Sequence, residues 1–360
     1  MIMKKQIFID IHAIQTVPPS CVNRDDTGSP KTATYGGVER ARVSSQAWKH
    51  SMRAYFRDIF ESEDMGSRTK HIIEKIAGYI TSIDPSFDDE KAAKAAQAAV
   101  EAIGIKIDKK TNENSALFFI SEAQAKAVAE LAASGCKDKK AYQQAIKEKP
   151  SFDIALFGRM VADDPNLNYD AAAQVAHAIS THAVHTEYDY FTAVDDMKSE
   201  DQSGAGHLGT VEFNSSTLYR YATVNVSELA KWTGADTAKV VCGFAEAFIR
   251  SMPTGKQNTF ANRTLPDMVY VAVRCDQPVN LAGAFECPVK CGNDGYVEKS
   301  CNALLSYADK MYSSFADKPE LALGCGGIAA LAEYSDVMPL NTLLDHLGTY
   351  IAEKCGKEEK

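Results

Sequence analysis

The chain has 360 residues and a formal net charge of -9 at pH 7, and 45% of its residues are hydrophobic. This length suggests roughly two domains, and the hydrophobic fraction supports a sizeable core. No stretch approaches the ~18 consecutive apolar residues of a membrane helix. The nine cysteines are scattered and odd in number, a pattern typical of a reducing compartment. We therefore expect a globular, cytoplasmic protein with no membrane partner.

The first segment, residues 7–17, alternates in period two and predicts a buried strand. Asp10 and His12 interrupt its apolar run, so we expect a strand here and no signal peptide.

A local excess of positive charge follows in residues 20–57, although the chain as a whole is acidic. The charged residues of this stretch are Arg24, Lys31, Arg40, Arg42, Lys49, Arg53 and Arg57 against Asp25, Asp26 and Glu39. Lysines and arginines gathered in a groove attract a polyanion, and acidic surface elsewhere keeps the protein off other nucleic acid. Gly36 and Gly37 predict a turn that lets backbone approach a sugar-phosphate chain closely.

A helix is predicted to begin after this loop. Ser44 to Gln46 supply an N-cap, and the first amides of such a helix form an anion site. Lys49 and Arg53 lie four residues apart and share one face, while the opposite face is predicted to be buried through Trp48, Met52 and Phe56. The alternative is an ordinary amphipathic helix with a solvated basic face.

The rest of the chain predicts a helical insertion within an α+β core. Four Ala- and Lys/Glu-rich segments predict helices over residues 62–80, 84–105, 115–135 and 139–149, and a fifth helix is predicted over 169–185. Strands are predicted over residues 211–226 and 266–274, with a helix over 237–252 between them. This order fits an RRM-like, ferredoxin-like core interrupted by insertions.

Long strings of the sequence resemble one known family. They are PPSCVNRDDTGSPKTATYGGVERARVSSQAWKHSMR (18–53), DIALFGRM (153–160), AHAISTHAVHTEYDYFTAVDD (176–196), GHLGTVEFNSSTLYRYATVNV (206–226) and PTGKQNTFANRTLPDMVYV (253–271). In this order they resemble the CasC family, the backbone subunits of the type I-E CRISPR Cascade complex, and residues 70–149 match only loosely.

The resemblance implies a fold shaped like a right hand. An RRM-like palm would take residues 1–59 and 218–360 with the C-terminal helices, helical fingers would take residues 60–180, and a protruding thumb would take residues 187–217. Several copies of such a subunit line one guide RNA as a helical filament and carry no catalytic step or cofactor.

The resemblance also implies residue roles. The guide backbone would be held by Arg24, Lys31, Ser44, Gln46, Lys49 and Arg53, and Met160 would press on a base. The thumb that separates one nucleotide from the next would include Phe191, Val194, His207 and Leu208. The alternative for these side chains is core packing, because an aromatic residue at the end of a helix, as expected for Phe191, is usually buried.

The thumb has support that does not depend on the family. Residues 195–208 are polar and contain Gly204 and Gly206, so they predict an exposed, mobile loop that would order only against RNA and a neighbouring copy. A plain surface connection is the alternative.

Two enzymatic hypotheses compete with a scaffold. The first is a zinc site made by His177, His182 and His185 with Glu187 and Asp189, but the spacing lacks the i, i+4 pair of a helical zinc site. A structural metal on Cys287, Cys291 and Cys301 would lack a fourth ligand nearby. The second is a metal-dependent nuclease using the carboxylate pairs at residues 25–26, 163–164 or 195–196. Adjacent carboxylates usually serve as caps or solvated loop charges.

The sequence therefore predicts an RNA-binding scaffold rather than an enzyme. Its expected partners are a CRISPR guide RNA, a target DNA strand paired through that guide, further copies of itself and other Cascade subunits. Specificity would then come from base pairing, while the protein holds backbone and shape.

Overall fold

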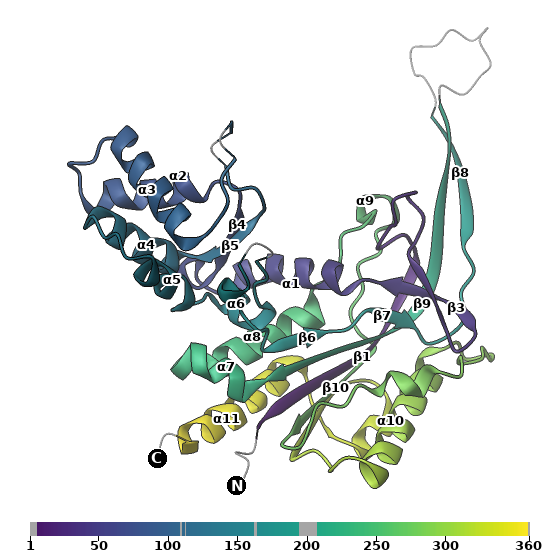
Figure 1. Ribbon diagram of the computed structural model, residues 1–360. Helices are drawn as coiled ribbons and strands as arrows, with labels where there is room; N and C mark the ends of the chain where they lie inside the picture. The colour runs from purple at the N-terminus through teal and green to yellow at the C-terminus, as the bar shows by residue number, and fades with distance from the viewer. Residues whose placement is uncertain (1–5, 109, 112, 162–163, 194–206, 359–360) are drawn as a thin grey trace, which may run out of the picture. The chain divides into compact units, whose positions relative to one another are not determined.

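The computed structural model describes residues 6–108, 110–111, 113–161, 164–193 and 207–358 (Figure 1). The chain divides into two compact units. Unit 1 comprises Met1–Met52, Val175–Thr223 and Phe244–Leu347, and unit 2 comprises Arg53–Gln174, Val224–Gly243 and Gly348–Lys360. The mixed α+β architecture agrees with the predicted fold class, whereas the palm, finger and thumb boundaries stay a prediction.

A large mixed sheet organises unit 1, in the order β12-β11-β10-β1-β9-β7-β3-β2. Its strands are β1 (Phe8–Ser20), β2 (Thr32–Tyr35), β3 (Val38–Val43), β7 (Ala178–Ser180), β9 (His207–Asn225), β10 (Met268–Arg274), β11 (Leu321–Gly326) and β12 (Asp336–Val337). Two further strands, β6 (Ala173–Val175) and β8 (Glu187–Ala193), also pair with β9. The α-helices that lie wholly in unit 1, among the described residues, are α9 (Gln257–Phe260) and α10 (Val297–Ser314).

The first strand forms as predicted and lies in the middle of this sheet. β1 pairs antiparallel with β10 from Phe8 opposite Arg274 to Ile14 opposite Met268. Both of its faces are buried, so the polar residues Asp10 and His12 are fully enclosed as well. Both contact tyrosines of β9, since the hydroxyl of Tyr221 donates to Asp10 Oδ1 at 2.8 Å and that of Tyr219 lies 2.9 Å from His12 Nδ1.

A long hairpin leaves this sheet. β8 pairs with the first part of β9 from Glu187 opposite Phe213 to Ala193 opposite His207, and every residue of β8 is exposed. Figure 1 shows the two strands running clear of the other strands of unit 1. Phe191 lies within the strand β8, so the expectation that it ends a helix is wrong.

Unit 2 is mostly helical. Its elements are β4 (Gly66–Thr69), α2 (Ile72–Ile83), α3 (Asp89–Ile103), β5 (Phe118–Ser121), α4 (Glu122–Ala133), α5 (Lys139–Lys147), α6 (Phe152–Phe157) and α7 (Val226–Thr233). Buried isoleucines of α2 and alanines of α3 and α4 form one core cluster. Asp88 caps α3, and Ser121 and Gln124 form a capping box on α4, so side-chain acceptors define both starts.

Three helices have residues in both units, because the boundaries between the units fall within them. They are α1 (Ser45–Ile59), α8 (Thr237–Arg250) and α11 (Leu340–Glu358). The predicted burial of Trp48, Met52 and Phe56 on α1 is confirmed.

The prediction of a helix over residues 169–185 is wrong. This segment contains β6 and β7, and Ile179 of β7 lies opposite both Arg42 of β3 and Tyr219 of β9. Burial alternates along both strands, which is the pattern of a sheet rather than of a helix. The first and third predicted helices also each lose their first part to a strand, β4 and β5, which pair with each other.

Candidate nucleic-acid interface

The loop at residues 23–31 of unit 1 is held by its own acidic residue. Oδ1 of Asp25 accepts hydrogen bonds from the amides of Thr27 and Ser29 at 2.9 and 3.0 Å and from the Thr27 hydroxyl at 2.7 Å. The hydroxyl bond lowers the pKa of Asp25. The amide of Lys31 donates to the Asn23 carbonyl at 2.8 Å, which closes the loop and leaves the Arg24 side chain exposed.

The start of α1 is attached to this loop. The Ser44 amide donates to Asn23 Oδ1 at 2.9 Å, and Ser44 Oγ accepts from the Ala47 amide at 3.4 Å, which confirms the predicted cap. The amide of Ser45 donates to His177 Nδ1 at 3.3 Å. Because two first-turn amides already have acceptors, phosphate would meet mainly side chains here, among them the exposed Gln46.

His177 marks the point where the basic side chains of unit 1 gather. Its pKa is lowered by burial and then by the charges of Arg42 and Lys31. Nη1 of Arg42 lies 3.4 Å from His177 Nδ1. Arg42 and the start of α1 therefore contact this ring and Lys31 lies near it, and sequence reasoning had not assigned Arg42 to the interface.

A second basic group, Lys256, was also missed. Burial raises the pKa of the Cys21 thiol, and the charges of Arg24 and Lys256 oppose that shift. A Cβ on the neighbouring Gly255 would lie 2.0 Å from the Val22 carbonyl oxygen, so only glycine allows this close approach.

Not every basic residue of the stretch belongs to the surface. Arg40 is fully buried and donates to the carbonyl oxygens of Tyr35, Ser180 and Phe285 at 3.1, 3.0 and 2.8 Å. The turn glycines also have an internal reason, since a Cβ on Gly36 would lie 1.6 Å from the carbonyl oxygen of Glu286. The close approach predicted there is made to the protein's own backbone.

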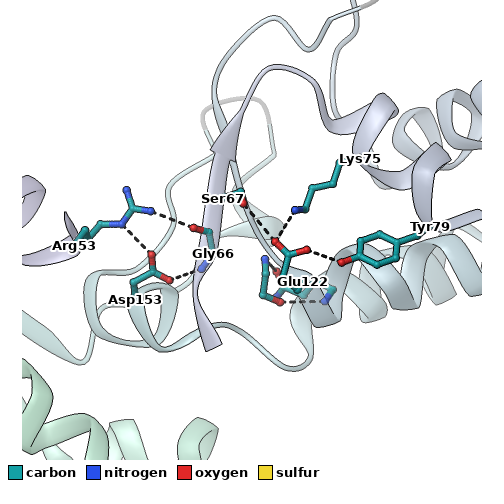
Figure 2. Close-up of polar contacts among 9 residues, drawn as sticks. Arg53, Gly66, Ser67, Lys75, Tyr79, Glu122 and Asp153 are labelled. Atoms are coloured by element: carbon teal, nitrogen blue, oxygen red, sulfur yellow. Dashed lines mark hydrogen bonds and ion pairs between the residues drawn. The ribbon is translucent and has the colours of Figure 1, made fainter. Parts of the chain in front are cut away.

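Arg53 lies in unit 2, where it is part of an ion pair (Figure 2). Its Nε is 2.9 Å from Oδ2 of the fully buried Asp153, and its Nη2 donates to the Gly66 carbonyl at 3.3 Å. Oδ1 of Asp153 accepts from the Gly66 amide at 2.9 Å, so one carboxylate joins α1 to β4. The Arg53 side chain is 15% exposed, which leaves little of it for a phosphate.

A second carboxylate in unit 2 is equally well satisfied. Glu122 accepts from Lys75 and Tyr79 at 2.6 Å each and from Ser67 at 3.5 Å (Figure 2). Its hydrogen bond raises the pKa of Tyr79 to about 12. These contacts join β4 and α2 to the start of α4 (Figure 2).

Met160, also in unit 2, is 88% exposed. It follows Gly158, whose φ of +74° and lack of a Cβ let the chain pass the Tyr169 carbonyl. The side chain is therefore accessible, and its contact with a base stays a prediction.

The hairpin carries the predicted thumb residues that the structure describes. Phe191 and Leu208 are 41% and 57% exposed. The Phe191 ring lies over Gly209, where a Cβ would be 2.3 Å from its Cζ. The backbone of His207 pairs with Ala193, while Val194 and most of the predicted mobile loop, residues 195–206, lie outside the described residues.

Some of the candidate metal and nuclease residues make other contacts in the part of the chain that the structure describes. His182 accepts from the Thr217 amide at 3.0 Å and stacks on Tyr296 at 3.7 Å. Cys301 is buried, which raises the pKa of its thiol to about 12, whereas Cys287 and Cys291 are exposed. Among the described residues, no three His, Cys, Asp or Glu side chains gather in a way that could hold a metal ion. The same part of the chain contains no helix that could span a membrane.

Comparison with known proteins identifies relatives of the whole chain. The CT1975-like protein family matches residues 9–338. A chain of the solved structure "CRISPR RNA-guided surveillance complex, pre-nicking" is 34% identical with a TM-score of 0.83, covering 96% of this chain and 100% of that chain. A chain of a "CRISPR RNA-guided surveillance complex" is 30% identical with a TM-score of 0.63, covering 95% and 99%. No curated protein matches.

Proposed function

Because the chain belongs to the CT1975-like protein family, and relatives of its full length are subunits of CRISPR RNA-guided surveillance complexes, we propose that it is a backbone subunit of a Cascade complex of type I-E. In this role it binds guide RNA, assembles with further copies and other Cascade subunits, and leaves the guide bases free to pair with target DNA. It performs no catalytic step.

The observation that carries this proposal is the basic surface of unit 1 in an acidic chain. Lys31 and Arg42 lie near His177, which contacts the start of α1, and the side-chain oxygens of Asn23 and Asp25 accept hydrogen bonds that fix the loop carrying Arg24 and Lys31. A fixed set of cations binds phosphate at a lower entropic cost than flexible side chains do. The groups contact backbone rather than base edges, which suits a protein that must accept any guide sequence.

We also propose that the sheet of unit 1 is the RRM-like palm and that the β8–β9 hairpin is the thumb. The hairpin supports this assignment because it is exposed along all of β8 and presents Phe191 and Leu208. An exposed two-stranded ribbon with apolar side chains gains stability when it packs against RNA or a second copy. Head-to-tail contact of this kind gives an open helical filament.

Co-purification tests the proposal. The full chain, expressed with a CRISPR array and the other subunits, should retain a small RNA of defined length. A Lys31→Ala, Lys49→Ala double variant should lose most of that RNA, whereas Lys126→Ala, which removes one exposed charge from α4, should retain it. Retention of no RNA by the wild-type chain, or stoichiometric zinc in place of RNA, would refute a scaffold role.

A further inference from the structure

A buried arginine lies against the start of α1 in unit 1. Arg220 of β9 is 1% exposed. The central carbon of its guanidinium lies 3.7 Å from the centre of the Trp48 ring and 4.5 Å from that of the Phe248 ring. Trp48 belongs to the first turns of α1, and Phe248 to the last turn of α8. The guanidinium is therefore enclosed between the sheet and two helices, and all three residues belong to unit 1.

The hydrogen-bond acceptors of Arg220 are neutral. Its Nη1 donates to Oε1 of Gln15 at 2.5 Å, and its Nη2 donates to the carbonyl oxygen of Phe248. Gln15 is fixed in turn, because its Nε2 donates to the carbonyl oxygen of Thr264 at 3.0 Å and to its Oγ1 at 3.1 Å. Nε of Arg220 has no hydrogen-bond partner among the described residues.

The charge of Arg220 has no counter-ion in the part of the chain that the structure describes. No carboxylate there pairs with the guanidinium, and burial alone lowers the pKa of Arg220 to about 9, so it stays charged at neutral pH. The carbonyl end of α8 carries only about half a negative charge, and the two ring faces attract a cation without bringing net charge. The start of α1, on the other side, has partial positive charge of its own.

A second buried arginine of unit 1 has the usual arrangement. Arg274 of β10 is also 1% exposed, but its Nη2 lies 2.6 Å from Oδ2 of Asp276. It stands opposite Phe8, whereas Gln15 is at the other end of β1. Seven residues of a strand span about 23 Å, so the two arginines are far apart. The arginine without a carboxylate is the one beside α1, and a buried cation without an anion is costly.

The opposite side of α1 carries candidate interface residues. Gln46 is exposed and stands two residues before Trp48, which places it about 160° around the helix. A phosphate on that side would lie about 10 Å from Arg220, which is roughly one helix diameter. Charges that interact through protein are screened by salt much less than charges in water. The charge of Arg220 can therefore attract a phosphate that its side chain cannot touch.

We propose that Arg220 is a positioning residue for guide RNA, which supplies fixed positive charge behind the first turns of α1 and holds Trp48 there without contacting the RNA. The inference rests on the proposed function and extends it to a residue of the core. Because the guanidinium is already ordered, it attracts phosphate without the entropic cost of fixing a flexible side chain. The alternative is a purely structural role, in which Arg220 only joins Gln15 to the end of α8.

Three substitutions at Arg220 separate its charge from its packing. Arg220→Gln and Arg220→Met both remove the charge, but only the first keeps a hydrogen-bond donor, so the two variants should differ in Tm. Both should weaken binding of the full chain, freed of nucleic acid, to a mixed-sequence single-stranded RNA by about fivefold. This is the effect of one charge about 10 Å away in surroundings between protein and water. Arg220→Lys keeps the charge and should bind within about twofold of wild type, even where its Tm falls.

The salt dependence of binding gives a second measurement. Because Arg220 touches no phosphate, both neutral variants should give lines of log affinity against log salt that run parallel to the wild-type line and below it. Arg274→Gln is the matched control, since it removes a buried arginine that lies well beyond a Debye length of about 10 Å from Arg220. It should lower Tm and leave RNA affinity within about twofold of wild type. Circular dichroism sets a temperature at which every variant is folded.

The outcomes separate this inference from the function on which it rests. If wild-type protein binds no RNA, the proposed function fails as well. If it binds RNA, but the affinities of the three Arg220 variants follow their Tm values, the structural alternative is correct and this inference alone is overturned. A shallower salt slope in the neutral variants would indicate direct contact with phosphate and would also contradict it.

Discussion

Arg53→Ala should destabilise unit 2 more than it weakens contact with RNA. The change removes the 2.9 Å ion pair to Asp153, the hydrogen bond to the Gly66 carbonyl and the contact with the Phe119 ring. It also leaves the fully buried carboxylate of Asp153 without a cation, with only neutral hydrogen-bond donors. Breaking a buried pair on one side costs about 3–5 kcal/mol, and the partial exposure of Arg53 favours the lower end, about 3 kcal/mol.

This magnitude predicts a clear thermal signal. For a unit of this size, about 3 kcal/mol corresponds to a fall in Tm of about 6–12 °C. Melting followed by circular dichroism should show it in the full chain. A double-mutant cycle with Asp153→Asn isolates the pair, because the second substitution should cost much less once Arg53 is gone.

The salt dependence of RNA binding distinguishes this structural role of Arg53 from a phosphate contact. If Arg53 mainly holds phosphate, Arg53→Ala would leave Tm unchanged and lower the slope of log affinity against log salt by roughly 0.7 for a single strand. That outcome would refute the structural role argued from its contacts. Arg53→Lys serves as a matched control, since it keeps the charge but loses the fork that reaches both Asp153 and Gly66.

Other substitutions separate the remaining roles. Lys49→Ala should lower the same salt slope by roughly 0.7 for every RNA sequence, and a loss confined to one sequence would contradict a phosphate contact. Gly209→Val should displace the Phe191 ring and prevent regular assembly on guide RNA while the monomer stays folded; normal filaments in electron micrographs would refute the thumb assignment. Burial raises the pKa of Asp10 to about 6 and lowers that of His12 to about 3. The contribution of Asp10 to the free energy of unfolding is lost as pH rises from about 4 to 6, and that of His12 is lost as pH falls below about 6.5. The two residues therefore change stability with pH in opposite directions. Asp10→Asn should therefore lose stability more steeply on acidification from pH 6.5 to 4 in urea titrations, and curves parallel to wild type would contradict this coupling.

The sequence predicted the elements whose signals are local. The first strand, the cap at Ser44 and the helices around residues 89–103 and 237–250 were found because alternation, capping residues and apolar periodicity lie within each segment. The strands β4 and β5 were missed because each has only four residues and adjoins a strong helix signal. Residues 169–185 were misassigned because their alanines favour a helix, while the pairing partners that make them strands lie in β3 and β9.

The residues of the candidate site also divide into those with a local signal and those without one. The basic loop was predicted from charge, but His177 was assigned to a metal hypothesis and Lys256 was not selected. The Ser45 amide at the start of α1 meets His177 Nδ1, and Gly255 beside Lys256 passes the Val22 carbonyl, in both cases between segments more than a hundred residues apart. A single sequence carries no local signal for such a meeting.

Charge counting alone fails because a cation's role depends on its acceptors. Arg40, Arg42 and Arg53 have the same side chain within one stretch, yet the first donates to three carbonyl oxygens in the core, the second faces His177 near the surface, and the third pairs with a buried carboxylate.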